Sequence, residues 1–320
     1  MIKKTQHSAF VVLVVYSIYG LFPMTALAAS EESIEYNTEY SKKGATTCIV
    51  CHDEDYQPPI YPIFETKHGE INDPRTPMGS LQCESCHGPV GEHKRTPAKG
   101  IKRAPIITFG KDSWVPVAKQ NGMCMQCHAD HRRISWQGSA HQMQDMLCVS
   151  CHVLHKRHDP MLDRQEQPKT CLRCHVKERA AFQKTSAHPV HYDQVKCSEC
   201  HNPHGSFAEN SLVQNTKNQT CYNCHAEKRG PFLWSHAPVM EDCTLCHETH
   251  GSIHPSLLKK RLPLLCQQCH SVVGHPSVAY DGSGLASGSA PNQFLLGKSC
   301  LNCHSQIHGS NHPSGVKLMR

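Results

Sequence analysis

Ten short motifs with the pattern Cys-x-x-Cys-His carry the chemistry of this sequence. Two cysteines three positions apart lie on the same side of a helical turn, so their sulfurs can bond to the two vinyl groups of one haem, and the adjacent histidine can bind the iron. We therefore predict ten covalently attached haem c groups. The attachment cysteines are Cys48, Cys51, Cys83, Cys86, Cys124, Cys127, Cys148, Cys151, Cys171, Cys174, Cys197, Cys200, Cys221, Cys224, Cys243, Cys246, Cys266, Cys269, Cys300 and Cys303. The proximal iron ligands are His52, His87, His128, His152, His175, His201, His225, His247, His270 and His304.

Zinc ribbons and thiol–disulfide oxidoreductases also use paired cysteines, but neither needs a histidine directly after the second cysteine. Histidine occupies 26 of the 320 positions, so chance would place one there in roughly one motif in twelve. All ten motifs have it, and together they use all 20 cysteines. The pattern excludes both alternatives and leaves no cysteine for a disulfide.

The motifs group into five two-haem units, at about residues 48–93, 124–155, 171–204, 221–250 and 266–308. Each unit contains a motif, a lone histidine, a second motif and a histidine soon after it, which is typical of a repeat array. We expect these ten extra histidines to be the distal iron ligands, with the pairing of ligand and haem left open. They are His68, His93, His141, His155, His188, His204, His236, His250, His275 and His308, with His312 as the alternative to His308.

Two histidines on every iron would leave no open position for a substrate, which favours electron transfer over catalysis at the iron. The methionines show no regular relation to the motifs, so Met ligation is not expected. The surplus histidines have no counterparts between units and are expected at the surface. They are His131, His158, His191 and His254.

The N-terminus predicts export. Lys3 and Lys4 precede an apolar run from Ala9 to Met24, and Ala26-Leu27-Ala28 supplies the small residues of a cleavage site. The run is short for a membrane span and contains a glycine and a proline, which disfavours a retained anchor. We expect residues 1–28 to be a signal peptide and 29–320 to be the cytochrome domain.

The composition predicts a protein that cannot fill its own interior. Only 38% of the residues are hydrophobic, while Gly and Pro number 20 and 21, so a protein core alone would not offset the conformational entropy. We expect a multihaem cytochrome c fold: a mostly irregular chain with short α-helices wrapped around an extended stack of ten haems. Residues 88–122 and 276–299 interrupt the array and are expected to be long surface loops.

The formal charge of +6 does not indicate a nucleic-acid partner. Each haem brings two propionates, and we expect the basic residues to neutralise these carboxylates. No nucleic-acid-binding motif is present.

Several longer strings resemble the MtrA/DmsE family of decahaem cytochromes. They are CYNCHAEKRGP (221–231), SHAP (235–238), CLNCHSQIHGSNHPSG (300–315), ITFGK (107–111) and LCQQCH (265–270). The resemblance covers essentially the whole chain after residue 28. It implies a periplasmic cytochrome that lies inside an outer-membrane β-barrel porin and conducts electrons across that membrane.

The resemblance also implies partners. The donor would be a periplasmic or inner-membrane, quinol-linked cytochrome, and the acceptor an extracellular multihaem cytochrome or surface reductase. Branches of the family respire anaerobically with metal oxides or with dimethyl sulfoxide, and this sequence does not separate the branches. The alternatives are a soluble periplasmic electron shuttle or store, and a multihaem reductase.

Overall fold

The computed structural model describes residues 37–270 and 300–320. Contacts divide the chain into Met1–Tyr36 and Asn37–Arg320, and all described residues belong to the second unit. The predicted signal peptide, His275 and the interruption at 276–299 lie outside the described residues.

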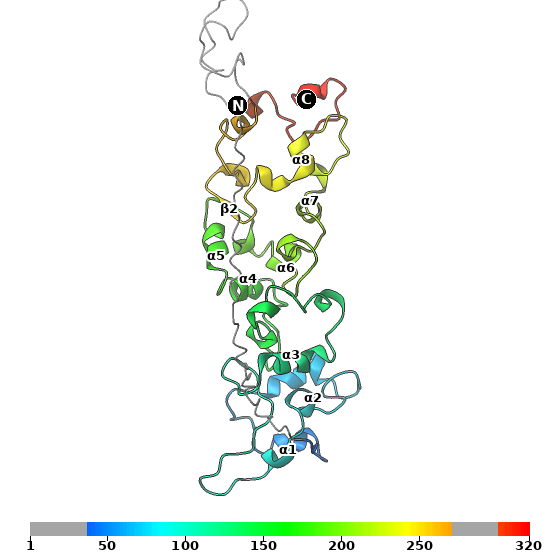
Figure 1. Ribbon diagram of the computed structural model, residues 1–320, viewed down its shortest axis with the longest axis vertical. Helices are drawn as coiled ribbons and strands as arrows, with labels where there is room; N and C mark the ends of the chain where they lie inside the picture. The colour runs from blue at the N-terminus through cyan, green and yellow to red at the C-terminus, as the bar shows by residue number, and fades with distance from the viewer. Residues whose placement is uncertain (1–36, 271–299) are drawn as a thin grey trace, which may run out of the picture. The chain divides into compact units, whose positions relative to one another are not determined.

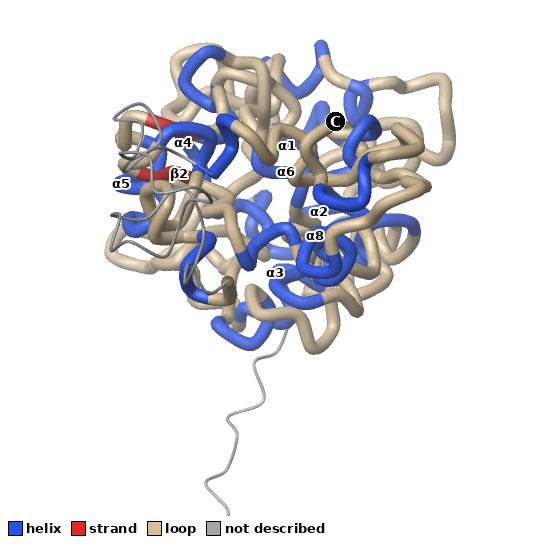
Figure 2. The backbone as a smooth tube through the Cα atoms, turned by 90° about the horizontal axis from the view of Figure 1, so that it is seen from above, coloured by secondary structure: helices blue, strands red, loops and turns tan. Residues whose placement is uncertain are grey.

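Helices in the described part are short. The longest α-helix there has nine residues, and Figure 2 shows the helices as brief blue segments between longer loops. The α-helices, labelled in Figure 1, are α1 (Ala45–Cys48), α2 (Glu84–His87), α3 (Val117–Met125), α4 (Glu166–Cys171), α5 (Val176–Phe182), α6 (Cys197–Cys200), α7 (Lys217–Tyr222) and α8 (Ala237–Glu241). This agrees with the prediction of a mostly irregular chain.

Single 3-10 turns (η1–η14) make up most of the remaining regular structure. They are Tyr61–Glu65, Lys67–Gly69, Gly91–Lys94, His131–Arg133, Gln142–Gln144, Cys148–Ser150, Val190–Tyr192, Glu209–Ser211, Ala226–Lys228, Cys243–Leu245, Pro255–Leu257, Cys266–Gln268, Cys300–Asn302 and Gly315–Lys317.

Every Cys-x-x-Cys-His motif folds into one helical turn. In all ten, the amide of the histidine donates to the carbonyl of the first cysteine, over 2.9–3.1 Å. In each of the first four units, a helix ends at or one residue after the first cysteine of the first motif. These helices are α1, α3, α4 and α7. Within each motif, one turn of backbone therefore carries both sulfurs and the imidazole, as the spacing predicts.

The apolar core is small. Leu172, Phe182 and Val190 form its one cluster among the described residues, with Ala187 and Val195 packed against it. No large side chain there is fully buried. The protein alone therefore leaves its interior incompletely packed, which fits a chain that folds around prosthetic groups.

Neighbouring units are joined by short antiparallel pairings. Strand β1 (Ser186–Ala187), just before His188, pairs with β2 (Gly251–Ser252), just after His250. The two strands lie side by side in red in Figure 2. Trp234 and Ser310 form an equivalent bridge between the fourth and fifth units. Each pairing brings the first extra histidine of one unit beside the second extra histidine of the next.

The interruption at 88–122 is more structured than a surface loop. It contains η3 and most of α3, and Val90, Ile107 and Val115 are buried. The expectation of a long surface loop was wrong here, because the segment's backbone carbonyls accept hydrogen bonds from two of the predicted ligand histidines.

Candidate haem-binding sites

The two motifs of each unit lie together through their first cysteines. In unit one the side chains of Cys48 and Cys83 lie close enough to shift each other's pKa, and the same proximity recurs in the other four units. The recurring pairs are Cys124–Cys148, Cys171–Cys197, Cys221–Cys243 and Cys266–Cys300. In the haem-loaded protein these cysteines would each hold one haem through a thioether bond, so the two attachment points of a unit lie together.

Consecutive units meet through their other cysteines. The pKa of Cys86 in unit one is raised mainly by burial and further by the nearby Cys127 of unit two. The same relation joins Cys151 to Cys174, Cys200 to Cys224, and Cys246 to Cys269. Within-unit and between-unit contacts alternate, so the ten attachment sites follow one another in sequence order without a branch.

Buried amide side chains hold the two motifs of a unit in place. Asn218, three residues before Cys221, donates to the carbonyl of Val239 and accepts from the amide of Cys243. Asn121 makes the same double contact in unit two. The buried Gln167 serves unit three differently: it accepts from the amide of Ser198 in the second motif and donates to the carbonyl of Met161, before the first motif. Sequence reasoning missed these residues. Their recurrence just before the first cysteine of a unit was the available signal.

Nine pairs of imidazole rings face each other, and each pair combines a proximal histidine with one of the predicted distal histidines. Their ring centroids are 5.9–6.5 Å apart. Two metal–imidazole bonds of about 2.0 Å in line, with half a ring on each side, would separate the centroids by about 6.3 Å. The pairs are His52–His93, His87–His155, His128–His68, His152–His204, His175–His141, His201–His250, His225–His188, His247–His308 and His270–His236.

Eight of these nine pairs join different units. The first extra histidine of a unit faces the first proximal histidine of the next unit, as His188 faces His225. The second extra histidine faces back to the second proximal histidine of the preceding unit, as His250 faces His201. The pair His52–His93 closes within unit one. Each unit therefore completes the sites of its neighbours.

Hydrogen bonds at Nδ1 fix the orientation of many of these rings. His141 donates to the carbonyl of Pro203 over 2.7 Å, and His188 to that of Thr249 over 2.6 Å. In both cases the acceptor directly precedes a second extra histidine of the next unit. A proton held at Nδ1 leaves the lone pair at Nε2 for a metal, which is the tautomer that an axial ligand requires.

Burial keeps many of the paired imidazoles uncharged, because charging a buried ring is unfavourable. It is the main cause that lowers the pKa of eight of them, namely His52, His87, His128, His155, His204, His236, His250 and His308. The largest of these shifts takes the pKa of His204 to about 4. A neutral ring is the form that binds metal.

A glycine after the second extra histidine allows the close approach between units. Gly205 follows His204 at φ 95°, and an added Cβ would collide with the carbonyl of Ser135 and the side chain of Ser139. Gly251 follows His250, and a Cβ there would meet the carbonyl of Ala181. The repeated His-Gly pair is thus explained by backbone packing against the preceding unit.

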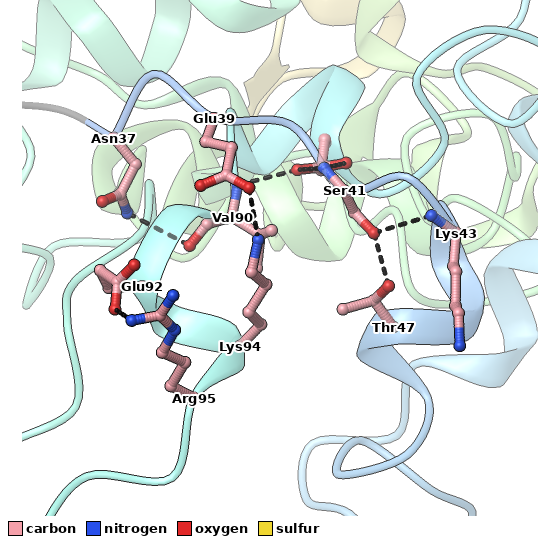
Figure 3. A network of polar contacts seen from close by, with 10 residues as sticks. Asn37, Glu39, Ser41, Lys43, Thr47, Val90, Glu92, Lys94 and Arg95 are labelled. Carbon is pink, nitrogen blue, oxygen red and sulfur yellow. Dashed lines mark hydrogen bonds and ion pairs between the residues drawn. The ribbon is translucent and has the colours of Figure 1, made fainter.

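The N-terminal edge of the first unit is held by a polar network around the turn that carries His93 (Figure 3). Glu39 and Lys94 form an ion pair of 2.8 Å. The buried carboxylate of Glu84 accepts from the amide of Ser41. These contacts hold η3, and with it His93, and the second motif against residues 39–41, which lead into the first motif.

The surplus histidines lie away from the ring pairs. His131, His158, His191 and His312 are exposed, and His254 is half-buried. The ring facing His247 is that of His308, while Nδ1 of His312 contacts Ser314 instead. His304 donates from Nδ1 to the carbonyl of Lys317, and His275 falls outside the described residues.

Within residues 37–270 and 300–320, no helix is long and apolar enough to cross a membrane. 

Comparisons with known proteins agree with this geometry. The chain is 49% identical over 282 residues to the multihaem cytochrome MtrA of Shewanella baltica (strain OS185), which covers 88% of this chain and 83% of that protein. The chain belongs to the MtrA family of multihaem cytochromes. It is thus a c-type cytochrome that carries several haem c groups and transfers electrons.

Shorter stretches match related cytochromes. The doubled CXXCH motif matches residues 188–230 and 236–275, the NrfB-like cytochrome c-type family matches 83–169, and the cytochrome c554 and c-prime family matches 22–88. The cytochrome c-type protein NrfB of Haemophilus influenzae (strain ATCC 51907 / DSM 11121 / KW20 / Rd) is 33% identical over 123 residues, which is 36% of this chain and 54% of that protein.

Proposed function

We propose that this member of the MtrA family is a periplasmic decahaem electron carrier. Ten haem c groups are held by ten pairs of histidines: the nine facing pairs, and His304 with His275. Bound haem supplies one-electron exchange between ferric and ferrous iron. The tenth pair is assigned by elimination, since these two histidines are the remaining proximal and distal candidates at the end of the array.

The protein's own residues make the carrier role more suitable than catalysis. Two imidazoles at each iron would leave no site for a substrate. The Nδ1 hydrogen bonds orient many of these imidazoles, and burial favours their neutral form. We therefore assign no catalytic residue, and the multihaem reductase becomes an outcome of the tests below.

We further propose that the electrons cross the outer membrane while the cytochrome lies inside a β-barrel porin. The unbroken order of the cysteine contacts, from Cys48–Cys83 to Cys266–Cys300, is the observation that carries this proposal. An unbranched array has two ends, and each end can serve a different partner. The predicted leader at residues 1–28 supports delivery to the periplasm.

The partners follow from this arrangement. A quinol-linked cytochrome of the periplasm or inner membrane donates electrons at one end. An extracellular multihaem cytochrome or surface reductase accepts them at the other, in anaerobic respiration with a metal or dimethyl sulfoxide. The polar lumen of a large barrel suits a cytochrome with few apolar residues.

The test is electron flow across a sealed membrane. The mature cytochrome is reconstituted with its co-produced barrel in liposomes that enclose a redox dye, and a reductant is added outside. We expect the dye to be reduced only when both proteins are present. The controls are liposomes with the barrel alone and with the cytochrome alone.

Location is measured alongside flow. Without the barrel, the cytochrome should fractionate with the soluble periplasm; with it, most of the cytochrome should sediment with the outer membrane and resist added protease. If the two proteins never co-purify and no dye is reduced, the conduit proposal fails and a soluble shuttle or store replaces it. Turnover of nitrite by the purified protein would instead favour a reductase.

A further inference from the structure

The second motif of each unit ends in a proximal histidine, and one of these five histidines has a different kind of hydrogen-bond partner from the others. In units one, three, four and five, Nδ1 of this histidine donates to a backbone carbonyl, over 2.7–2.9 Å. The pairs are His87–Ile107, His201–Asn210, His247–Ser256 and His304–Lys317. In unit two, Nδ1 of His152 contacts the carboxylate of Asp159.

Local sequence explains this difference. In units three and four the acceptor carbonyls belong to Asn210 and Ser256, which lie in turns with φ of 53° and 55°. The sequence after His152 makes no such turn and places Asp159 seven residues on. The carboxylate is itself held in place, because its second oxygen accepts from the amide of Met161 over 3.0 Å.

The other carboxylates near paired histidines are farther away. Glu178 and Glu227 approach Nδ1 of His175 and His225 only to 4.0 and 3.9 Å, beyond hydrogen-bonding distance. The Asp159 side chain is also only 17% exposed, so water screens its charge less. Across the ring pair, the buried Nδ1 of His204 has no hydrogen-bond partner in the described part of the chain.

A carboxylate acceptor makes an imidazole a stronger donor to its metal than a carbonyl does. It is fully charged, and a charge-assisted hydrogen bond is roughly twice as strong as a neutral one. It draws the Nδ1 proton away from the ring and leaves more negative charge at Nε2, which raises ligand basicity. A more basic axial ligand stabilises ferric over ferrous iron.

We propose that Asp159 lowers the reduction potential of the haem bound through His152. This haem would be the hardest to reduce among the five haems attached to the second motifs of the units. This rests on the proposed ligation by the pair His152–His204. The step concerned transfers one electron: this iron goes from ferric to ferrous as the neighbouring donor iron is oxidised, and no atom moves. Asp159 acts through His152 and is a positioning residue.

As a consequence, an electron would be less stable on the fourth of the ten consecutive sites than on its neighbours. At partial reduction, electrons would reside on either side of this site before they occupy it. The segment of three sites before it and the segment of six after it would then exchange electrons more slowly than sites within a segment do.

The test is a redox titration of the haem-loaded protein and of Asp159→Asn. The asparagine amide still accepts from Nδ1 but carries no charge. We expect about one tenth of the haem absorbance to move to higher potential, with about a tenfold change in its reduction equilibrium, or about 59 mV for one electron. One low-spin ferric EPR signal should change with it.

Two further variants separate charge from position. Glu178→Gln removes a carboxylate that lies near an imidazole without a hydrogen bond, and its titration curve should stay close to that of the wild type. Asp159→Glu retains the charge, and its curve should lie nearer to the wild type than that of Asp159→Asn.

The outcomes are distinguishable. If Asp159→Asn retains ten low-spin haems and its titration curve superimposes on the wild type, this inference is overturned while the proposed function stands. If Asp159→Asn makes one haem high-spin, Asp159 serves only to hold His152, which also overturns the tuning role. If the wild-type protein already has a high-spin haem at the Cys148 motif, the proposed ligation itself fails.

Discussion

Replacing His188 by alanine tests the cross-unit pairing in one position. The ring of His188 belongs to unit three, but it faces His225 of unit four at a centroid distance of 6.4 Å. The substitution should therefore remove the distal ligand of the haem on Cys221 and Cys224, and leave both haems of unit three six-coordinate. One iron in ten should change from low-spin to high-spin.

The expected loss of stability is small. The substitution removes the hydrogen bond from Nδ1 to the carbonyl of Thr249, which is 2.6 Å long and exposed, and such a bond contributes about 1 kcal/mol. The variant should therefore fold and incorporate its haems, with a slightly lower thermal midpoint.

The assay is visible and EPR spectroscopy of the oxidised protein with added cyanide. We expect about one tenth of the haem to show a high-spin signal and to bind cyanide, and added imidazole to restore the low-spin spectrum. His191→Ala is the matched control, because His191 lies three residues on, is exposed, and has its Nε2 3.1 Å from Nε2 of Gln183. It should leave every haem low-spin. If His188→Ala also leaves every haem low-spin and unable to bind cyanide, the pairing with His225 is wrong.

Three other outcomes are expected. The intact mass of the mature protein should exceed that of the polypeptide after residue 28 by ten haem masses, and a shortfall of two or more would refute the motif count. Asn218→Ala should destabilise the protein by about 1–3 kcal/mol, because the part-buried amide of Cys243 loses its acceptor; thermal unfolding measures this, and Asn223→Ala at the exposed end of α7 should change the midpoint little. Burial lowers the pKa of His204 in the folded protein, and binding to iron would likewise keep the ring neutral, so the unfolded chain takes up this proton first and stability should fall as the pH falls from about 6.5 towards 4. A thermal midpoint that is constant across this pH range would contradict the role of that buried neutral ring.

The attachment motifs could be predicted from the sequence because their geometry is local. A histidine four positions after the first cysteine of its motif, such as His52 after Cys48, needs only one helical turn to lie beside the two sulfurs, and all ten motifs form that turn. The composition also predicts short helices, since proline and glycine are frequent and disfavour long ones, as where Gly88 ends α2.

The pairing of the distal histidines could not be predicted because it depends on long-range contacts. Strand pairing between Ser186 and Ser252 joins unit three to unit four, and the ring of His188 faces that of His225 in the same pair of units. No spacing in the sequence encodes that partner. The repeat in the sequence identified the candidate histidines. It did not show that most of them face a proximal histidine of a neighbouring unit.

The segment 88–122 and Asp159 show a second limit of sequence reasoning. Composition predicted a surface loop, yet the carbonyl of Ile107 accepts from His87 and that of Ala104 from His93. Backbone carbonyls have no sequence signature, so such second-layer contacts are invisible in the sequence. Asp159 had a signal, as a carboxylate seven residues after a proximal histidine, but only the fold distinguishes it from the other acidic residues.

The central claim is that ten irons lie in a single file, each between two named histidines. Anomalous diffraction at the iron edge from crystals of the mature protein tests this directly. The account predicts ten iron peaks in sequence order, nine of them midway between the facing ring pairs and the tenth between His304 and His275. Fewer than ten peaks, or an iron with one histidine and an open position opposite, would contradict it.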